Sequence, residues 1–227
     1  MRCGVFGKLP AKRDFIAMGA PRGFLDVWEP WLQGGLTDSR MRLGAGWRDA
    51  FLTAPIWRFW LGAELCGSTV AGAFMPSVDG VGRYFPLAVF AAAEGWDAIP
   101  PPELNPQEPW FERIEDLLLS SLEAGAEFGA FTTRLTELDG PATGIPQSAF
   151  EGLTQLSPTT FLVPAAPDIL RGALTREAMH VHAYALQSVW WTHGGVDFAP
   201  AALVAKRMPD PFLFSYLLTG RFEQSHI

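Results

Sequence analysis

The sequence predicts an α/β protein of the α+β kind, in which an antiparallel sheet is flanked by helices. Segments rich in β-branched and aromatic residues are interspersed with segments whose apolar residues recur at helical spacing. The clearest strand pair, 68–74 and 84–91, is joined by a loop containing Asp79, Gly80 and Gly82, which supply turn chemistry. Because hairpins join antiparallel neighbours, this pattern favours an antiparallel sheet over a doubly wound parallel one.

The composition fits a folded globular chain and argues against a nucleic-acid-binding module. Hydrophobic residues make up 48% of the 227 residues and charged residues 18%, which allows a sizeable core and is unlike a disordered chain. The 17 basic residues are scattered among 24 acidic ones, giving a net charge of −7, whereas phosphate binding needs an excess of clustered Lys and Arg. No nucleic-acid partner is expected.

Nothing in the sequence directs export or membrane insertion. Charged residues interrupt the N-terminal apolar run before it reaches the length of a signal peptide. The longest nearly uncharged stretch with strand character, 69–93, contains proline, glycine and charged residues, so it cannot form a membrane helix. Cys3 and Cys66 are too few for a disulfide framework or a structural zinc site, and we expect both to be reduced. These features predict a soluble, cytoplasmic protein.

The first elements are predicted from apolar spacing and from proline positions. A strand at 3–6 should end at the Gly and Pro residues that follow it. The apolar residues of 23–36 recur at helical spacing, although Pro30 should kink or divide this helix. A second, short helix is expected around Trp47, and the aromatic-rich segment 56–61 reads as a strand that precedes the hairpin.

A proline-rich connector at 99–106 leads to a strongly amphipathic helix with Pro109 in its first turn. The 3.6-residue period predicts that one stripe of this helix packs against the sheet. The stripe consists of Trp110, Phe111, Ile114, Leu117, Leu118 and Leu122. A shorter helix is expected over 128–138.

Turn-forming residues cluster at 139–146 without periodic apolar residues, so this segment is the best candidate for an internal boundary. The chain is therefore expected to comprise an α/β core at 1–138 and a C-terminal part at 139–227 that packs on the same core. The second part is predicted to contain strands at 159–163 and 187–192 and a terminal helix at 211–218.

No segment carries a catalytic or metal-binding motif. The segment from Gly4 to Lys8 differs from a phosphate loop, because two residues instead of four separate its glycines and no Ser or Thr follows the lysine. His180 and His182 lack a third ligand at a fixed spacing, so a metal site there is the less favoured interpretation. There is no Gly-x-Ser-x-Gly elbow and no signature of an activated thiol. Neither a cofactor nor a metal is expected.

Two polar clusters embedded in apolar sequence are candidates for function. The first contains Lys8, Lys12, Arg13 and Asp14, and the second contains Asp79, Arg83 and Tyr84. Two interpretations remain open for them: ion pairs and turn formers that brace the loops, or a surface that binds a partner.

Arg58 and a tryptophan pair are further candidates. Arg58 alternates with Trp57 and Phe59, as a strand residue would, and can pair with a carboxylate from either polar cluster. We expect Arg58, Asp79 and Arg83 to act mainly as braces that hold the loops, with Asp14 as another candidate partner. Trp190 and Trp191 are adjacent strand residues and face opposite ways, so one is expected in the core and the other either under a helix or exposed to a partner.

Three of these segments resemble the signature blocks of the TagF family of type VI secretion-associated proteins. The blocks read VFGKLPAKRDFI at 5–16, PIWRF at 55–59 and MPSVDGVGRYFPL at 75–87. The helix from Trp110 and the SVWW strand at 188–191 are also similar. One departure is Arg13, because the family usually has glycine there. If that glycine adopts a positive φ, Arg13 would be strained or the loop rearranged.

The resemblance implies a bacterial cytoplasmic regulator that is not an enzyme. It implies a post-translational repressor of type VI secretion that binds the forkhead-associated scaffold protein of the apparatus, alongside a serine/threonine kinase and phosphatase. It also implies an N-terminal part similar to longin-like or profilin-like folds. Two alternatives remain: a small enzyme such as a hydrolase, with a site assembled from distant residues, or a structural subunit of the secretion apparatus.

Overall fold

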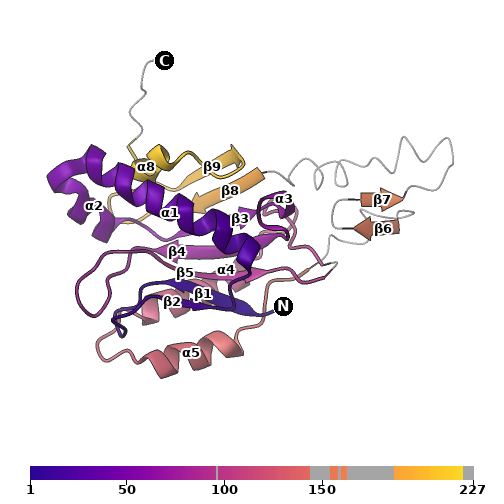
Figure 1. Cartoon of the computed structure of the whole chain (residues 1–227), viewed down its shortest axis with the longest axis horizontal. Coiled ribbons are helices and arrows are strands. Elements are labelled where there is room, and N and C mark those ends of the chain that lie inside the picture. Colours follow the sequence, from indigo (N-terminus) through magenta and orange to yellow (C-terminus); the bar gives the residue numbers. More distant parts are fainter. Residues whose placement is uncertain (96, 144–153, 158–159, 163–186, 222–227) are drawn as a thin grey trace, which may run out of the picture.

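The centre of the molecule is a seven-stranded antiparallel sheet, which confirms the predicted fold class (Figure 1). The computed structural model of the protein describes residues 1–95, 97–143, 154–157, 160–162 and 187–221. The strand order is β2-β1-β5-β4-β3-β8-β9. The strands are β1 (Cys3–Gly7), β2 (Ile16–Met18), β3 (Trp57–Leu61), β4 (Val70–Met75), β5 (Leu87–Ala92), β8 (Gln187–Thr192) and β9 (Ala201–Lys206). A separate two-stranded sheet pairs β6 (Thr154–Ser157) with β7 (Thr160–Leu162).

Helices cover both faces of the sheet and divide the core into two layers (Figure 1). One face carries α1 (Arg22–Leu43), α2 (Trp47–Thr53) and α8 (Phe214–Thr219), the last entered through a 3₁₀ turn at Pro211–Leu213. The other face carries α4 (Glu108–Ser120) and α5 (Phe128–Glu137). The short helices are η1 (Gly44–Gly46) and α3 (Ala63–Cys66). Because alternate strand residues face opposite layers, Trp57 and Phe59 pack toward α1, whereas Trp60 packs toward α4.

The predicted hairpin forms between β4 and β5. Their register pairs Val70 with Ala92 and Met75 with Leu87. The second strand, β5, begins at Leu87, three residues later than predicted, because residues 84–86 belong to the connecting loop. Within that loop, an isolated bridge joins Val78 to Tyr84.

Two expectations about the helices differ from the structure in part. Of the two effects expected of Pro30, division of the helix does not occur, because α1 is continuous through Pro30. Its ring is on the exposed side, while Trp28 and Trp31 on either side of it are buried against the sheet, so packing holds both halves in one helix. Leu122 is not part of the buried stripe of α4, because the helix ends at Ser120 and Leu122 is 53% exposed in the turn beyond it. The other predicted stripe residues are buried.

The C-terminal strands complete the same sheet. β8 has the predicted bounds and pairs with β3, and β9 pairs with β8 at the edge. The predicted terminal helix is present as the 3₁₀ turn and α8. The predicted strand at 159–163 corresponds to β7, although residues 159 and 163 lie outside the described residues. The elements that the sequence analysis does not predict are β2, β6, β9, η1 and α3. In the described part of the chain, no helix has both the length and the apolar character needed to cross a bilayer.

Candidate functional site

Two loops lie side by side at one end of the sheet, and together they are named the loop pair. They are the β1–β2 loop at 8–15 and the β4–β5 loop at 76–86. They meet because β1 and β5 are neighbours, with Gly7 opposite Leu87. Two bonds to backbone carbonyls join them: the Gly80 amide donates to the Lys12 oxygen at 2.8 Å, and Arg83 Nη2 donates to the Arg13 oxygen.

The side chain of Asp79 is the centre of the loop pair. It is completely buried and accepts four hydrogen bonds. Oδ2 accepts from Lys8 Nζ at 2.9 Å and from Arg83 Nε at 2.6 Å. Oδ1 accepts from the backbone amides of Arg83 at 2.8 Å and of Val81 at 3.1 Å. The geometry is that of the bracing interpretation, with Lys8, Asp79 and Arg83 in one network.

These donors keep Asp79 ionised. Burial by itself would raise the pKa of the carboxyl, but the hydrogen bonds from the Arg83 amide, Lys8, the Arg83 guanidinium and the Val81 amide outweigh it and hold the pKa well below its usual range. Because Lys8 and Arg83 bring two positive charges to a single carboxylate, the network has an excess of one positive charge, and the side chain of Arg83 is 58% exposed.

The backbone at the start of the loop pair requires glycine. Gly7 has a φ of +133°, and a Cβ there would lie 2.0 Å from the Pro86 carbonyl oxygen. Arg13, by contrast, is not strained: among the described non-glycine residues, only Gln107 and Arg207 have a positive φ. The loop therefore accepts Arg13 with ordinary backbone geometry. Asp14 is exposed and forms no ion pair within 4.0 Å in the part of the chain that the structure describes.

Arg58 lies elsewhere, and its expected pairing with the polar loops is wrong. It is 1% exposed on the face of β3 that packs under α4. Nε and Nη2 donate to the two carboxylate oxygens of Glu115 at 2.5 and 3.1 Å. Nη1 donates to both oxygens of Glu108 at 2.7 Å. The guanidinium also lies 5.1 Å from the centre of the Phe111 ring.

The two glutamates determine the electrostatics of this second site. Burial works against the charge of Arg58, but hydrogen bonds to Glu115 and then to Glu108 outweigh it and raise the guanidinium pKa. The hydrogen bond from Arg58 is also the main reason why the pKa of Glu108 is lowered, with burial opposing it. His193 Nε2 lies 3.2 Å from Glu108 Oε1 and joins the β8–β9 connection to α4.

Sequence reasoning missed Glu108, Glu115 and His193. A signal for the glutamates was present, because Glu108, Phe111 and Glu115 are spaced by three and four residues and therefore lie on one stripe of α4. No comparable pattern indicated His193.

Trp57 and Trp190 are core residues, and Trp191 is partly buried. Trp57 is buried and donates from Nε1 to the Leu217 oxygen at 2.9 Å. Trp190 is fully buried, and its ring is parallel to the Trp28 ring, with 5.7 Å between the ring centroids. Trp191 faces the other layer, where its ring and the Phe111 ring of α4 are steeply inclined to each other, with their centroids 4.9 Å apart. One of the two predicted outcomes for this pair is therefore correct: one ring is in the core, and the other lies under a helix.

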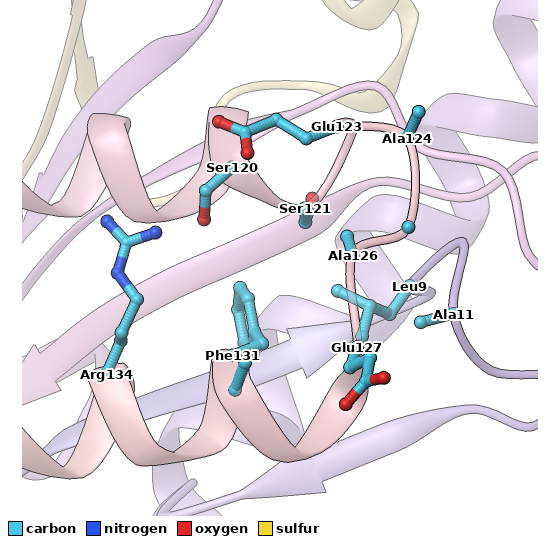
Figure 2. Close-up of a pocket in the computed structure, with 12 residues that line it drawn as sticks. Leu9, Ala11, Ser120, Ser121, Glu123, Ala124, Ala126, Glu127, Phe131 and Arg134 are labelled. Carbon is cyan, nitrogen blue, oxygen red and sulfur yellow. The ribbon is translucent and has the colours of Figure 1, made fainter.

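A pocket of about 300 Å³ lies between the β1–β2 loop, α5 and the end of α4 (Figure 2). Leu9 and Phe131 are its buried apolar residues, and Figure 2 shows the Phe131 ring and the Arg134 side chain directed from α5 toward α4. The hydroxyls of Ser120 and Ser121 donate to carbonyls of their own helix at 2.7 and 2.6 Å. The rest of the lining consists of Ala11, Glu123, Ala124, Gly125, Ala126, Glu127 and Ala130.

The cysteines and histidines form no reactive centre among the described residues. Burial raises the pKa of the Cys3 thiol to about 11 and that of the Cys66 thiol to about 12, so both are protonated at neutral pH. Both are free. Within the described ranges, no group of three or more His, Cys, Asp or Glu side chains is placed to hold a metal. His180, His182 and His226 lie outside those ranges.

Comparison with known proteins identifies the family. A family model described as the TagF N-terminal domain, type VI secretion system-associated, matches residues 4–138, which include the loop pair, Arg58 and α4. No curated protein matches the chain. The crystal structure of PA0076 from Pseudomonas aeruginosa PAO1 has a TM-score of 0.79 and 33% sequence identity to it, covering 99% of this chain and 97% of that one. The chain belongs to the TagF family of type VI secretion-associated proteins.

Proposed function

We propose that this protein is a cytoplasmic, non-enzymatic repressor of type VI secretion that acts by binding the forkhead-associated scaffold protein of the apparatus. The observation that carries the proposal is the match of residues 4–138 to a type VI secretion-associated domain. A functional link to the serine/threonine kinase and phosphatase of the same system belongs to this proposal. The chain would act after translation, by occupying the scaffold.

The state of the polar groups within the matched domain favours binding over turnover. All four donors around Asp79, and the guanidinium of Arg58, are engaged in internal bonds. A general acid or base must instead present a free face to its substrate at hydrogen-bond distance. The serine hydroxyls that line the pocket are likewise bonded to their own helix. These groups position surfaces, as a binding module requires.

The mechanism predicts a stoichiometric effect, which a titration can measure. Expression of the chain is varied against a fixed level of scaffold, and the amount of secreted effector is followed. Repression should saturate near one copy per scaffold molecule when binding is tight. Repression at a small fraction of one copy would indicate an enzyme, because each enzyme molecule processes many substrates.

Deletion of the chain separates the repressor from the structural alternative. Loss of a repressor should increase effector secretion, whereas loss of a structural subunit should abolish it. A strain that lacks the scaffold is the control, and in it varying the chain should leave the residual secretion unchanged. Repression that persists when binding to the scaffold has been lost would contradict the proposal.

A further inference from the structure

We propose that the exposed tip of the loop pair is the docking surface for an acidic segment of the protein partner. The tip is formed by Arg13, Phe15, Val81 and Arg83, at the left-hand end of the sheet in Figure 1. The inference rests on the proposed function, because it specifies the face through which the chain would bind the scaffold. Three features of the loop pair lead to it: its charge, its rigidity and its exposed apolar groups.

The charge of the loop pair is opposite to that of the chain. The two loops contain Lys8, Lys12, Arg13 and Arg83 against Asp14 and Asp79, whereas the whole chain has a net charge of −7. Lys8 and Asp79 are both largely buried and paired with each other, so the accessible charges are those of Lys12, Arg13 and Arg83 against that of Asp14. Arg13 is exposed and forms no ion pair with another described residue. Such a surface attracts carboxylates and steers their approach.

The tip is held in one conformation before any partner arrives. Asp79 is buried with four donors directed at it, and two further bonds tie the loops together through the carbonyls of Lys12 and Arg13. A preordered loop loses less conformational entropy when it binds, so a given set of contacts yields more affinity. The side chains of Arg13 and Val81 take no part in this network, and they remain available for contact.

Apolar side chains lie among the cations. Phe15 is 41% exposed and Val81 is 54% exposed, while Phe15 also packs edge-on against Phe6 and Phe85. Arginine and aromatic residues are enriched at protein interfaces. The combination fits a partner segment that carries Asp or Glu beside an apolar residue. The pocket of Figure 2 is lined by Glu123 and Glu127 and by none of the four tip residues, so it is not part of this surface.

Two substitutions test the surface without disturbing its brace. Arg13→Glu reverses an exposed charge and keeps the carbonyl that accepts from Arg83. Val81→Asp places a carboxylate at the tip and keeps the amide that donates to Asp79. Arg22→Glu is the matched control, because the side chain of Arg22 is 94% exposed. Arg22 lies at the opposite end of the sheet: its neighbour Gly23 is close to Cys66, in the short helix that follows β3. All three full-length variants should melt close to the unaltered protein.

Binding to the purified scaffold is measured by calorimetry at low and physiological ionic strength. Arg13→Glu and Val81→Asp should each weaken binding at least about tenfold. Arg13→Glu should also make the affinity for the scaffold depend less on ionic strength. Arg22→Glu should bind with the affinity of the unaltered protein. Equal affinity of all variants for the scaffold would overturn the assignment of the tip as the docking surface and leave the proposed function intact. If the unaltered protein does not bind the scaffold, the proposed function fails, and this inference fails with it.

Two further arms separate carboxylates from other anions. Treating the scaffold with a phosphatase should leave the affinity unchanged, and loss of binding would identify phosphate as the ligand and overturn the carboxylate assignment. Vesicles containing phosphatidylglycerol test for an anionic membrane surface. Vesicle binding that Arg13→Glu abolishes, together with unaffected scaffold binding, would reassign the tip to lipid.

Discussion

Arg58 and Glu115 form a side-on ion pair that joins the central sheet to α4, with Nε to Oε1 at 2.5 Å and Nη2 to Oε2 at 3.1 Å. Two parallel N–H to oxygen bonds are the strong geometry for arginine and a carboxylate. Glu108 engages the remaining amino group, Nη1, from the first turn of the same helix. The position of α4 over the sheet therefore depends on one buried cation as well as on apolar packing.

Removing Arg58 should cost far more stability than removing an exposed arginine. Arg58→Ala removes the buried cation that Glu108 and Glu115 share and opens a cavity under α4, and we expect a loss of about 2–4 kcal/mol in the free energy of unfolding, because both glutamates are partly exposed. Arg134→Ala is the control, because its exposed side chain has no ion pair among the described residues, and it should change stability by less than about 0.5 kcal/mol. Urea unfolding of both variants measures the difference, and similar midpoints would show that the ion pairs do not hold α4.

Asp79→Asn should lower the melting temperature, because an amide cannot accept from all four donors or balance the charges of Lys8 and Arg83. Asp14→Asn, on the same loop pair, should melt like the unaltered protein, since Asp14 is exposed. Differential scanning calorimetry gives both values. If the two variants have the same melting temperature, the buried carboxylate does not brace the loops.

The contribution of Asp79 should also depend on pH. Its pKa in the folded protein is below the ordinary value of 3.8, so folding favours the ionised form, and the stabilisation is fully present above that ordinary value. It is lost as the pH falls below about 4 toward the folded-state pKa. The difference in melting temperature between the unaltered protein and Asp79→Asn should therefore be constant from neutral pH to about 5 and narrow at lower pH. A difference that widens on acidification would contradict this assignment.

Gly7→Ala should destabilise the protein by more than about 1 kcal/mol, because Gly7 has a φ of +133° and the added Cβ would meet the Pro86 carbonyl. The matched control is Gly129→Ala at the start of α5, where a Cβ meets nothing within 4 Å. There the change should be neutral or stabilising by up to about 1 kcal/mol. Chemical denaturation of the two variants compares them, and equal stability would mean that the backbone at Gly7 can rearrange.

The sequence alone determined the elements whose information is local. The hairpin of β4 and β5 follows from the turn residues between them, and α4 follows from Pro109 and from one apolar stripe. The opposite orientation of Trp190 and Trp191 follows from the two-residue period of a strand. The contact between Asp79 and Arg83 was also indicated, because an acidic turn residue stands four positions before a basic one, whereas bracing was one of two interpretations left open.

Tertiary structure decided the features that depend on which surfaces meet. Arg58 pairs with glutamates that are 50 and 57 residues away in the sequence, because α4 crosses the face of β3 on which Arg58 lies. α1 remains one helix through Pro30, because burial of Trp28 and Trp31 outweighs the local cost of proline. β9 becomes a strand only by pairing with β8, since Ala201–Lys206 has little sequence pattern of its own. Such contacts are set by the packing of distant segments, and local propensity does not encode them.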